Sequence, residues 1–311
     1  MSDPKGRGAT WTEGYTREPK GKGDGEVGGA TEASGITEPR TDEGAAGLAA
    51  IVRDPGRALI ALDFDGTLAP IVTDPGAARP HPAVLPALGR LAPSVGTLAI
   101  ITGRPAAKAV ELGGFESIPG LIVIGHHGWE RWQAGELSSP PPPPGMALAR
   151  DRLPAVLAGA GAPDGTWVED KDHALVVHTR RTADPTGAQQ LLAGPLAALA
   201  ETAGLDCKPG RLVIELRARG TDKGTALNAL VAERYPGAVL FAGDDLGDLP
   251  AFAAVRAMRT AGRYGVTVYS ASGEVTALSG EADLVADGPE GVAALLAWLA
   301  DALPVPPSRA R

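Results

Sequence analysis

The chain has 311 residues, a length that fits two folded domains or one large domain with appendages. Hydrophobic residues make up 44% of the sequence, enough to form cores, while 42 glycines and 28 prolines predict many turns. The formal net charge of -8 excludes a global basic field that would collect nucleic acid or anionic lipid. We therefore expect a globular protein without a nucleic-acid or membrane partner, in which a phosphorylated ligand would need a local group of cations.

Cysteine content and the absence of long apolar segments indicate the compartment. Cys207 is the only cysteine, which excludes an internal disulfide framework and a multi-cysteine metal site. The first residues lack the apolar core of a signal peptide, and no window approaches the roughly 18 consecutive apolar residues that span a bilayer. We expect a cytoplasmic protein.

The two ends of the chain differ from the rest in composition. Residues 1–47 are rich in Gly, Glu, Thr and Lys and show no apolar periodicity, which predicts a disordered tail. A short amphipathic helix, AAGLAAIVRDP, and a buried strand, RALIALDFDG, then open the fold. Residues 305–311 are expected to form a second tail.

Strands and helices alternate in two stretches, residues 48–138 and 220–304. The expected buried strands lie in RALIALDFDG, GTLAIITGR, GLIVIGHHG, GAVLFAGDD and YGVTVYSAS. Helical segments separate most of them, an order that predicts right-handed βαβ crossovers and a parallel sheet. WERWQAGEL is expected to form a short hairpin after the third strand. The predicted fold class is α/β, with a doubly wound parallel-sheet core.

The stretch between them, residues 139–219, has a different rhythm. At its start lies SSPPPPPG, residues 138–145, a stiff extended segment that no core element could accommodate. Two units follow, each a helix and then a hairpin, and the second hairpin is expected to turn at Pro209-Gly210. We expect a small α+β domain with an antiparallel sheet, inserted into the parallel-sheet domain.

Acidic residues follow two of the predicted strands. Asp63 and Asp65 lie in LDFDGTLAP after the first strand, and AGDDLGD contributes Asp244, Asp245 and Asp248 after a later one. Carboxyl ends of parallel strands hold ligands, and carboxylates that close repel unless a cation compensates. Oxygen ligands favour a hard cation such as Mg²⁺. The alternative is a set of turn residues that cap helices.

Groups suited to an anion lie between the two acidic segments. ITGR follows the second strand, where the Thr102 hydroxyl and the adjacent backbone N–H groups, including that of Gly103, could cradle phosphate. Lys223 in TDKG opens a helix, where the helix dipole disfavours a cation. Two carboxylates and a phosphate group would supply a reason for that placement.

These four segments, in this order, resemble the motifs of the haloacid dehalogenase superfamily of phosphotransferases. The resemblance implies that Asp63 is a nucleophile forming an aspartyl-phosphate and that Asp65 acts as general acid and then base. It implies that Thr102, Gly103 and Lys223 hold the phosphoryl group, and that Asp63, Asp65 and Asp244 bind Mg²⁺. It leaves open which of Asp244, Asp245 and Asp248 contacts the metal directly.

Further segments resemble the trehalose-6-phosphate phosphatases: GHHG, VEDKDHALVVHTR, GRLVIELRARGTDKG and GDDLGDLPAF. That resemblance implies Mg²⁺-dependent hydrolysis of trehalose 6-phosphate in trehalose biosynthesis, with a functional link to trehalose-6-phosphate synthase. It also implies that the inserted domain is a cap in which Glu169, Lys171 and Glu215 contact the sugar. His178, Arg180 and Arg217 match the family without a clear role.

Three other functions stay open at the level of the sequence. A different sugar phosphatase, acting on sucrose phosphate or a glycosyl phosphoglycerate, would share the core chemistry. A mutase using the same phospho-aspartate would return the phosphoryl group to a sugar. A non-catalytic sugar-phosphate sensor would keep the fold without turnover, although none of the expected chemical groups is missing.

Overall fold

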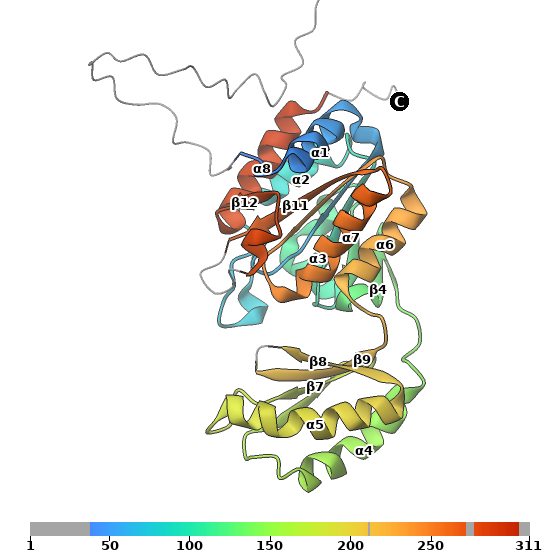
Figure 1. Ribbon diagram of the computed structural model, residues 1–311, viewed down its shortest axis with the longest axis vertical. Coiled ribbons are helices and arrows are strands. Elements are labelled where there is room, and N and C mark those ends of the chain that lie inside the picture. The colour runs from blue at the N-terminus through green and yellow to red at the C-terminus, as the bar shows by residue number, and fades with distance from the viewer. Residues whose placement is uncertain (1–37, 211, 272–276, 305–311) are drawn as a thin grey trace, which may run out of the picture. The chain divides into compact units, whose positions relative to one another are not determined.

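A computed structural model describes residues 38–210, 212–271 and 277–304, so most of the predicted first tail and all of the second lie outside the described residues. The chain divides into two compact units, which we call the core unit and the inserted unit (Figure 1). The inserted unit is Ser139–Thr221, and the core unit is the rest. No helix among the described residues has both the length and the apolar character needed to cross a membrane.

The core unit is built on one mostly parallel sheet. Within the described residues this sheet has eight strands, in the order β12-β11-β10-β1-β2-β3-β4-β5. In chain order they are β1 (Ala58–Leu62), β2 (Thr97–Ile101), β3 (Ile122–Gly125), β4 (Glu130–Gln133), β5 (Glu136–Ser138), β10 (Ala238–Gly243), β11 (Tyr264–Ser270) and β12 (Leu284–Ala286). β1 lies between β2 and β10 and is parallel to both. The chain winds outward from β1 on one side and from β10 on the other, so a ligand crevice is expected where these two strands end.

Helices cover both faces of this sheet, as Figure 1 shows. One face packs against α1 (Asp42–Arg53), α2 (Val84–Leu91), α3 (Ala106–Gly113) and α8 (Gly288–Ala302), and the other against α6 (Lys223–Arg234) and α7 (Leu249–Thr260). In β1 the side chains of Ile60 and Leu62 face the first group, and Leu59 and Ala61 face the second. Because both faces are buried, the strand is a continuous apolar run, as the sequence predicted.

The predicted hairpin WERWQAGEL forms β4 and β5, but it also extends the sheet. β4 pairs with β3 in the antiparallel sense, so this edge departs from the purely parallel prediction. The connection between β3 and β4 is too short for a parallel crossover. It turns at His126 and His127, whose φ values of 48° and 58° lie in the left-handed region. β12 was not predicted, because a three-residue strand is too short to show a period.

The predicted tail extends too far, because α1 already begins at Asp42. Thr41 caps the helix, its Oγ1 accepting a hydrogen bond from the backbone N–H of Gly44 (3.0 Å). A side chain at Gly47 would place its Cβ 2.5 Å from Cγ2 of Val266 in β11, so glycine is what lets the helix approach the sheet. Gly47, which lies within the predicted tail, is therefore a packing residue.

The inserted unit is an antiparallel sheet with helices on one face. Its four described strands lie in the order β6-β7-β9-β8. The elements are α4 (Gly145–Gly159), β6 (Trp167–Asp170), β7 (Ala174–His178), α5 (Pro185–Ala203), β8 (Leu205–Gly210) and β9 (Val213–Ala218). Pro209 and Gly210 still pair with β9, so the second hairpin turns later than predicted. The proline run Pro140–Pro144 belongs to no helix or strand, as expected.

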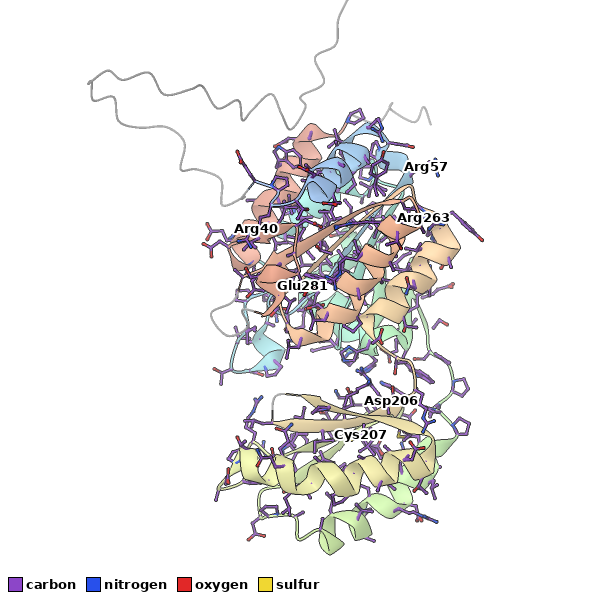
Figure 2. All side chains as sticks on the ribbon, in the orientation of Figure 1. Arg40, Arg57, Asp206, Cys207, Arg263 and Glu281 are labelled. Carbon is purple, nitrogen blue, oxygen red and sulfur yellow. The ribbon has the colours of Figure 1, made fainter. Side chains whose placement is uncertain are left out.

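The two faces of this sheet carry different side chains. Leu175, Val177 and Leu216 pack with α4 and α5, and Cys207 packs against them. Successive residues of a strand point to opposite faces, so Asp206 lies on the other face, as the labelled pair in Figure 2 shows. Antiparallel partners share a face, which places Glu169, His178 and Glu215 on that second face as well.

A buried carboxylate, Asp283, anchors α1 to the sheet. It accepts hydrogen bonds from the Thr41 hydroxyl (2.5 Å), from the Thr267 backbone N–H (2.7 Å) and from the Arg259 guanidinium. Burial raises the pKa of Asp283, but these hydrogen bonds outweigh it and hold the pKa below its usual value. A pKa lowered by folding stabilises the protein at neutral pH, and this stabilisation is lost as the pH falls through the folded-state value.

We expect Asp283→Ala to lower the free energy of unfolding by about 3 kcal/mol at neutral pH, because Arg259 loses its buried partner. Urea unfolding followed by circular dichroism measures the change. Asp301→Ala removes an exposed partner of Arg90 and serves as the control, with an expected effect below about 0.5 kcal/mol. The gap between wild type and Asp283→Ala should narrow as the pH falls from about 5 to about 3. A gap that does not change with pH would contradict the electrostatic role.

Candidate active site

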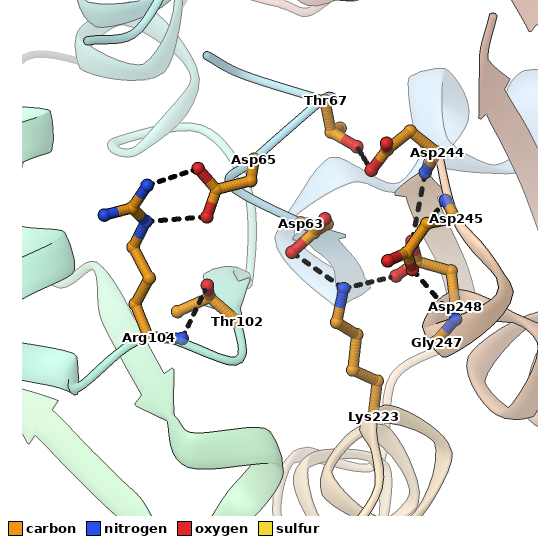
Figure 3. A network of polar contacts seen from close by, with 10 residues as sticks. All are labelled: Asp63, Asp65, Thr67, Thr102, Arg104, Lys223, Asp244, Asp245, Gly247 and Asp248. Atoms are coloured by element: carbon orange, nitrogen blue, oxygen red, sulfur yellow. Dashed lines mark hydrogen bonds and ion pairs between the residues drawn. The ribbon is translucent and has the colours of Figure 1, made fainter. Parts of the chain in front are cut away.

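Two aspartates meet where β1 and β10 end. Asp63 directly follows β1, and its backbone N–H continues the pairing by donating to the Ala242 carbonyl (2.9 Å). Asp244 directly follows β10, and both side chains are buried, with 3% of each residue exposed. Figure 3 shows the two carboxylates on the same rim of the sheet. The strand order thus brings together residues that are far apart in the sequence.

Asp248 completes a cluster of three carboxylates. One oxygen from each of Asp63, Asp244 and Asp248 lies within 4.8 Å of the others, and all three residues are buried. Asp248 also organises its own loop, since it accepts hydrogen bonds from the backbone N–H groups of Asp244 (3.0 Å) and Asp245 (3.1 Å). The Asp245 carboxylate instead accepts from the Gly247 N–H (2.8 Å) on the surface. Of the three acidic residues in this loop, Asp244 and Asp248 belong to the cluster.

Lys223 is the cation within this cluster. It is the first residue of α6, and its Nζ lies 2.8 Å from Oδ1 of Asp63 and 2.7 Å from Oδ1 of Asp248. Burial alone would lower the pKa of Lys223, but Asp248 and Asp63 raise it well above its usual value. Lys223 therefore stays protonated at neutral pH. Its two carboxylate partners explain why a lysine is placed against the helix dipole.

One lysine does not balance three buried carboxylates. Burial, with the repulsion of Asp248 and Asp245 added, raises the pKa of Asp244 to about 7. Burial also raises the pKa of Asp63, although Lys223 opposes the change. Groups that resist ionisation this strongly, arranged as converging oxygen donors, fit a hard divalent cation. Asp63, Asp244 and Asp248 could hold such a cation at this rim of the sheet.

The loop after β1 is fitted closely around this cluster. Gly66 has φ +75°, and a Cβ there would overlap the Asp244 carboxylate, so the position requires glycine. The Ser270 hydroxyl, at the end of β11, donates to the Gly66 carbonyl (2.7 Å). Thr67 Oγ1 lies 3.5 Å from Oδ1 of Asp244. Neighbouring strands thereby fix the position of the loop.

Asp65 faces a different partner from the other aspartates. Its two carboxylate oxygens accept hydrogen bonds from Nε (2.6 Å) and Nη2 (2.5 Å) of Arg104, which also donates to the Pro75 carbonyl (2.7 Å). Figure 3 shows this pair on the opposite side of Asp63 from Asp244. The sequence placed Asp65 among the metal ligands, whereas its carboxylate is paired with Arg104. The ITGR segment by itself does not predict this role for Arg104, because the pairing depends on how two loops meet.

Thr102 and Gly103 lie at the end of the neighbouring strand, β2. Thr102 is buried, and its Oγ1 accepts a hydrogen bond from the Arg104 backbone N–H (3.2 Å). A Cβ at Gly103 would lie 2.9 Å from Nε2 of His127, so this loop passes close to the imidazole. The N–H of Ala106, at the start of α3, is already bonded to the Glu130 carboxylate (2.7 Å). That helix amide is therefore already engaged and does not offer its N–H to an anion.

The three residues expected to contact sugar all lie in the inserted unit. Val176 of β7 pairs with Glu169 of β6 on one side and with Glu215 of β9 on the other. The two glutamates therefore lie on one face of the sheet, and two strand spacings separate their backbones by about 10 Å. Each has a basic neighbour: His178 Nε2 lies 3.1 Å from Oε2 of Glu169, and Arg217 lies 3.3 Å from Glu215. Lys171 lies in the turn after β6, where its backbone N–H donates to the Ala174 carbonyl (2.9 Å). This polar face suits a ligand with many hydroxyl groups.

The fold is that of the haloacid dehalogenase-like hydrolases. A hydrolase of this class from Bacteroides thetaiotaomicron superposes with a TM-score of 0.58 over 77% of this chain and 98% of that chain, at 16% identity. The trehalose-6-phosphate phosphatase of Aspergillus fumigatus superposes with a TM-score of 0.63 over 85% of this chain and 99% of that chain, at 26% identity. The predicted fold class is confirmed.

The sequence pattern of the trehalose-phosphatase family matches residues 61–286, which include every candidate residue of both units. The chain belongs to this family. The trehalose-phosphate phosphatase of Mycobacterium avium is 35% identical over 230 residues, which cover 68% of this chain and 54% of that protein. The chain spans about half the length of the curated relatives it matches.

The raised carboxylate pKa values predict how a divalent cation changes stability. A carboxylate whose pKa is raised by folding destabilises the protein as the pH rises from about 4 toward about 7, because the unfolded chain releases its protons first. We expect Mg²⁺ to raise the thermal unfolding midpoint more at about pH 8 than at about pH 5, since protons compete for the same oxygens. Differential scanning fluorimetry measures both shifts.

A matched pair of variants controls this experiment. Asp244→Asn removes a member of the cluster and should abolish most of the Mg²⁺-dependent shift. Asp245→Asn changes the exposed neighbour and should retain it. Equal shifts in the two variants would show that the cation binds elsewhere.

Proposed function

We propose that the protein is a Mg²⁺-dependent phosphatase that hydrolyses trehalose 6-phosphate to trehalose and phosphate. The observation that carries the proposal is the pairing of buried Lys223 with Asp63 beside Asp244 and Asp248, at the carboxyl end of the sheet. This arrangement provides a nucleophilic carboxylate, a fixed cation and oxygen donors for a metal. Family membership supports the sugar phosphate as substrate.

The first step transfers the phosphoryl group to Asp63. An Asp63 carboxylate oxygen forms a bond to phosphorus while the bond from phosphorus to the sugar oxygen breaks, and the Asp65 carboxyl group gives its proton to that oxygen. In the second step the Asp65 carboxylate takes a proton from water, whose oxygen bonds to phosphorus as the phosphorus bond to Asp63 breaks. Phosphate leaves, and both aspartates return to their starting states.

The other residues of the site hold charge in place during these steps. Lys223, the Thr102 hydroxyl and the backbone N–H of Gly103 would bind the phosphoryl oxygens. A Mg²⁺ ion held by Asp63, Asp244 and Asp248 would supply positive charge that stabilises the phosphoryl oxygens in the transition state.

Asp65 has to leave Arg104 before it can act as an acid. Both oxygens of the Asp65 carboxylate accept hydrogen bonds from the Arg104 guanidinium, on the opposite side of Asp63 from Asp244 (Figure 3). An arriving phosphoryl group is a competing anion for Arg104. We infer that Arg104 exchanges Asp65 for phosphate, which frees Asp65 to carry the proton.

The inserted unit, which corresponds to the predicted cap at residues 139–219, is proposed to select the sugar. Its second sheet face offers acceptors at Glu169 and Glu215, and Lys171 offers a donor in the turn after β6. The disaccharide presents hydroxyl groups that both donate and accept. Sucrose phosphate or a glycosyl phosphoglycerate would use the same core chemistry. The intact set of chemical groups favours an enzyme over a non-catalytic sensor. The proposed place of action is the cytoplasm, in sequence with a synthase that makes the substrate.

The mechanism predicts a strong effect from two conservative substitutions. Asp63→Asn should lower kcat by on the order of 10³-fold or more, because the nucleophile is lost. Asp65→Asn should lower it by about 10²- to 10⁴-fold, because proton transfer is lost. Single-turnover assays with labelled substrate would also show phosphate retained on protein in the second variant. Asp301→Asn changes an exposed Asp of the core unit and should leave kcat unchanged. Substantial residual turnover by Asp63→Asn would refute the mechanism.

The substrate is tested by measuring phosphate release from trehalose 6-phosphate, sucrose 6-phosphate, glucose 6-phosphate and a glycosyl phosphoglycerate. Each is assayed with Mg²⁺ and with EDTA. We expect release that needs Mg²⁺ and is fastest by far with trehalose 6-phosphate. Preference for another sugar would keep the core chemistry and refute the substrate, whereas no release from any of them would favour the sensor.

A further inference from the structure

Two aromatic rings stack at the edge of the sheet in the inserted unit. Trp167 on β6 is directly opposite His178 on β7. Their rings are parallel to within 5°, with centroids 3.8 Å apart. The Arg181 guanidinium lies over the Trp167 ring, 5.5 Å from its centroid. The imidazole of His178 is therefore held in one plane by its neighbours.

This stack directs a hydrogen bond toward Glu169. Nε2 of His178 lies 3.1 Å from Oε2 of Glu169. An ionised carboxylate only accepts hydrogen bonds, so Nε2 is the donor. The Glu169 side chain is 42% exposed, whereas that of His178 is 20% exposed. A glutamate this exposed on an edge strand would otherwise sample several rotamers. The ligand would then have to order the side chain, and the conformational entropy lost would weaken binding.

The stack lies apart from the groups that hold the unit together. The hydrophobic cluster under α4 and α5 contains neither Trp167 nor His178. The turn that follows β6 has its own anchor on the other face, where Arg150 of α4 donates to the Asp170 carboxylate (2.5 and 2.9 Å) and to the Asp172 carbonyl (3.1 Å). Loss of the stack should therefore leave the fold of the hairpin intact.

We propose that Trp167 and His178 are positioning residues that preset the Glu169 carboxylate for a sugar hydroxyl. The proposal rests on the proposed function, because it takes Glu169 as a sugar contact. Glu215 on the same face has an equivalent partner in Arg217, at 3.3 Å. Glu169 and Glu215, the two proposed sugar acceptors, are thus each held by a neighbouring donor, and the indole of Trp167 adds a rigid support on the Glu169 side.

Three variants separate the donor from the stack. His178→Phe keeps an aromatic ring against Trp167 but removes the N–H donor, and we expect it to raise KM for trehalose 6-phosphate about tenfold with kcat within about twofold. His178→Gln restores an N–H at similar reach and should recover most of the affinity. Trp167→Leu keeps the donor without its support and should raise KM about threefold.

The controls distinguish positioning from general damage. His81→Phe makes the same change in the core unit and should leave both constants unchanged. p-Nitrophenyl phosphate contains no sugar, so its kcat/KM should be the same in all variants if the effect acts through Glu169. Thermal midpoints of the variants should agree with wild type, because the stack lies outside the hydrophobic cluster.

The outcomes separate this inference from the proposed function. If wild type hydrolyses trehalose 6-phosphate and His178→Phe has an unchanged KM, positioning is refuted and the function stands. A His178→Gln variant no better than His178→Phe, or an equal loss with p-nitrophenyl phosphate, would also refute it. If wild type hydrolyses p-nitrophenyl phosphate but not trehalose 6-phosphate, the proposed function fails and this inference fails with it.

Discussion

The core unit depends on a single buried cation that is shared by two carboxylates. Lys223 bridges Asp63 at the end of β1 and Asp248 in the loop after β10, within 2.8 Å of both. Charges in such a position are tolerated only when they are paired and hydrogen-bonded, so each element around them must hold its geometry. The start of α6, the end of β1 and the acidic loop are therefore fixed relative to one another by electrostatics as well as by packing.

The charge left over after this pairing is what makes the site chemically useful. Burial, with the repulsion of Asp248 and Asp245 added, raises the pKa of Asp244 to about 7, and its carboxylate oxygens are donors for a divalent cation. Arg104 donates hydrogen bonds to both carboxylate oxygens of Asp65, so Asp65 does not add to the unbalanced negative charge of the cluster. Asp63 and Asp248 thus share Lys223, whereas Asp65 is paired with Arg104. The proposed mechanism, in which Asp63 is the nucleophile and Asp65 carries the proton, needs such a division.

The sequence predicted the parts of this site that depend on short-range order. Asp63, Thr102 and Asp244 each follow a strand whose apolar run is unmistakable, and Lys223 opens a helix. Pairings between side chains of two different loops could not be predicted from the sequence. The pairing of Arg104 with Asp65 is the main example. The stack of Trp167 on His178 needs the cross-strand register, which the turn between β6 and β7 sets. The start of α1 was missed because Gly44 and Gly47 look like tail composition, although their lack of a side chain serves close packing.

The anchoring of α1 has a consequence for how the chain can be shortened. Composition would place a cut near the predicted end of the tail, within the first turns of this helix. Such a cut would remove Thr41 and also Arg40, whose backbone N–H donates to the Asp283 carbonyl (2.7 Å). The surface of β11 that α1 covers would then face water, and a recombinant fragment would expose an apolar patch that promotes aggregation. A fragment that keeps α1 anchored therefore has to begin before Arg40, in a stretch that composition assigns to the tail.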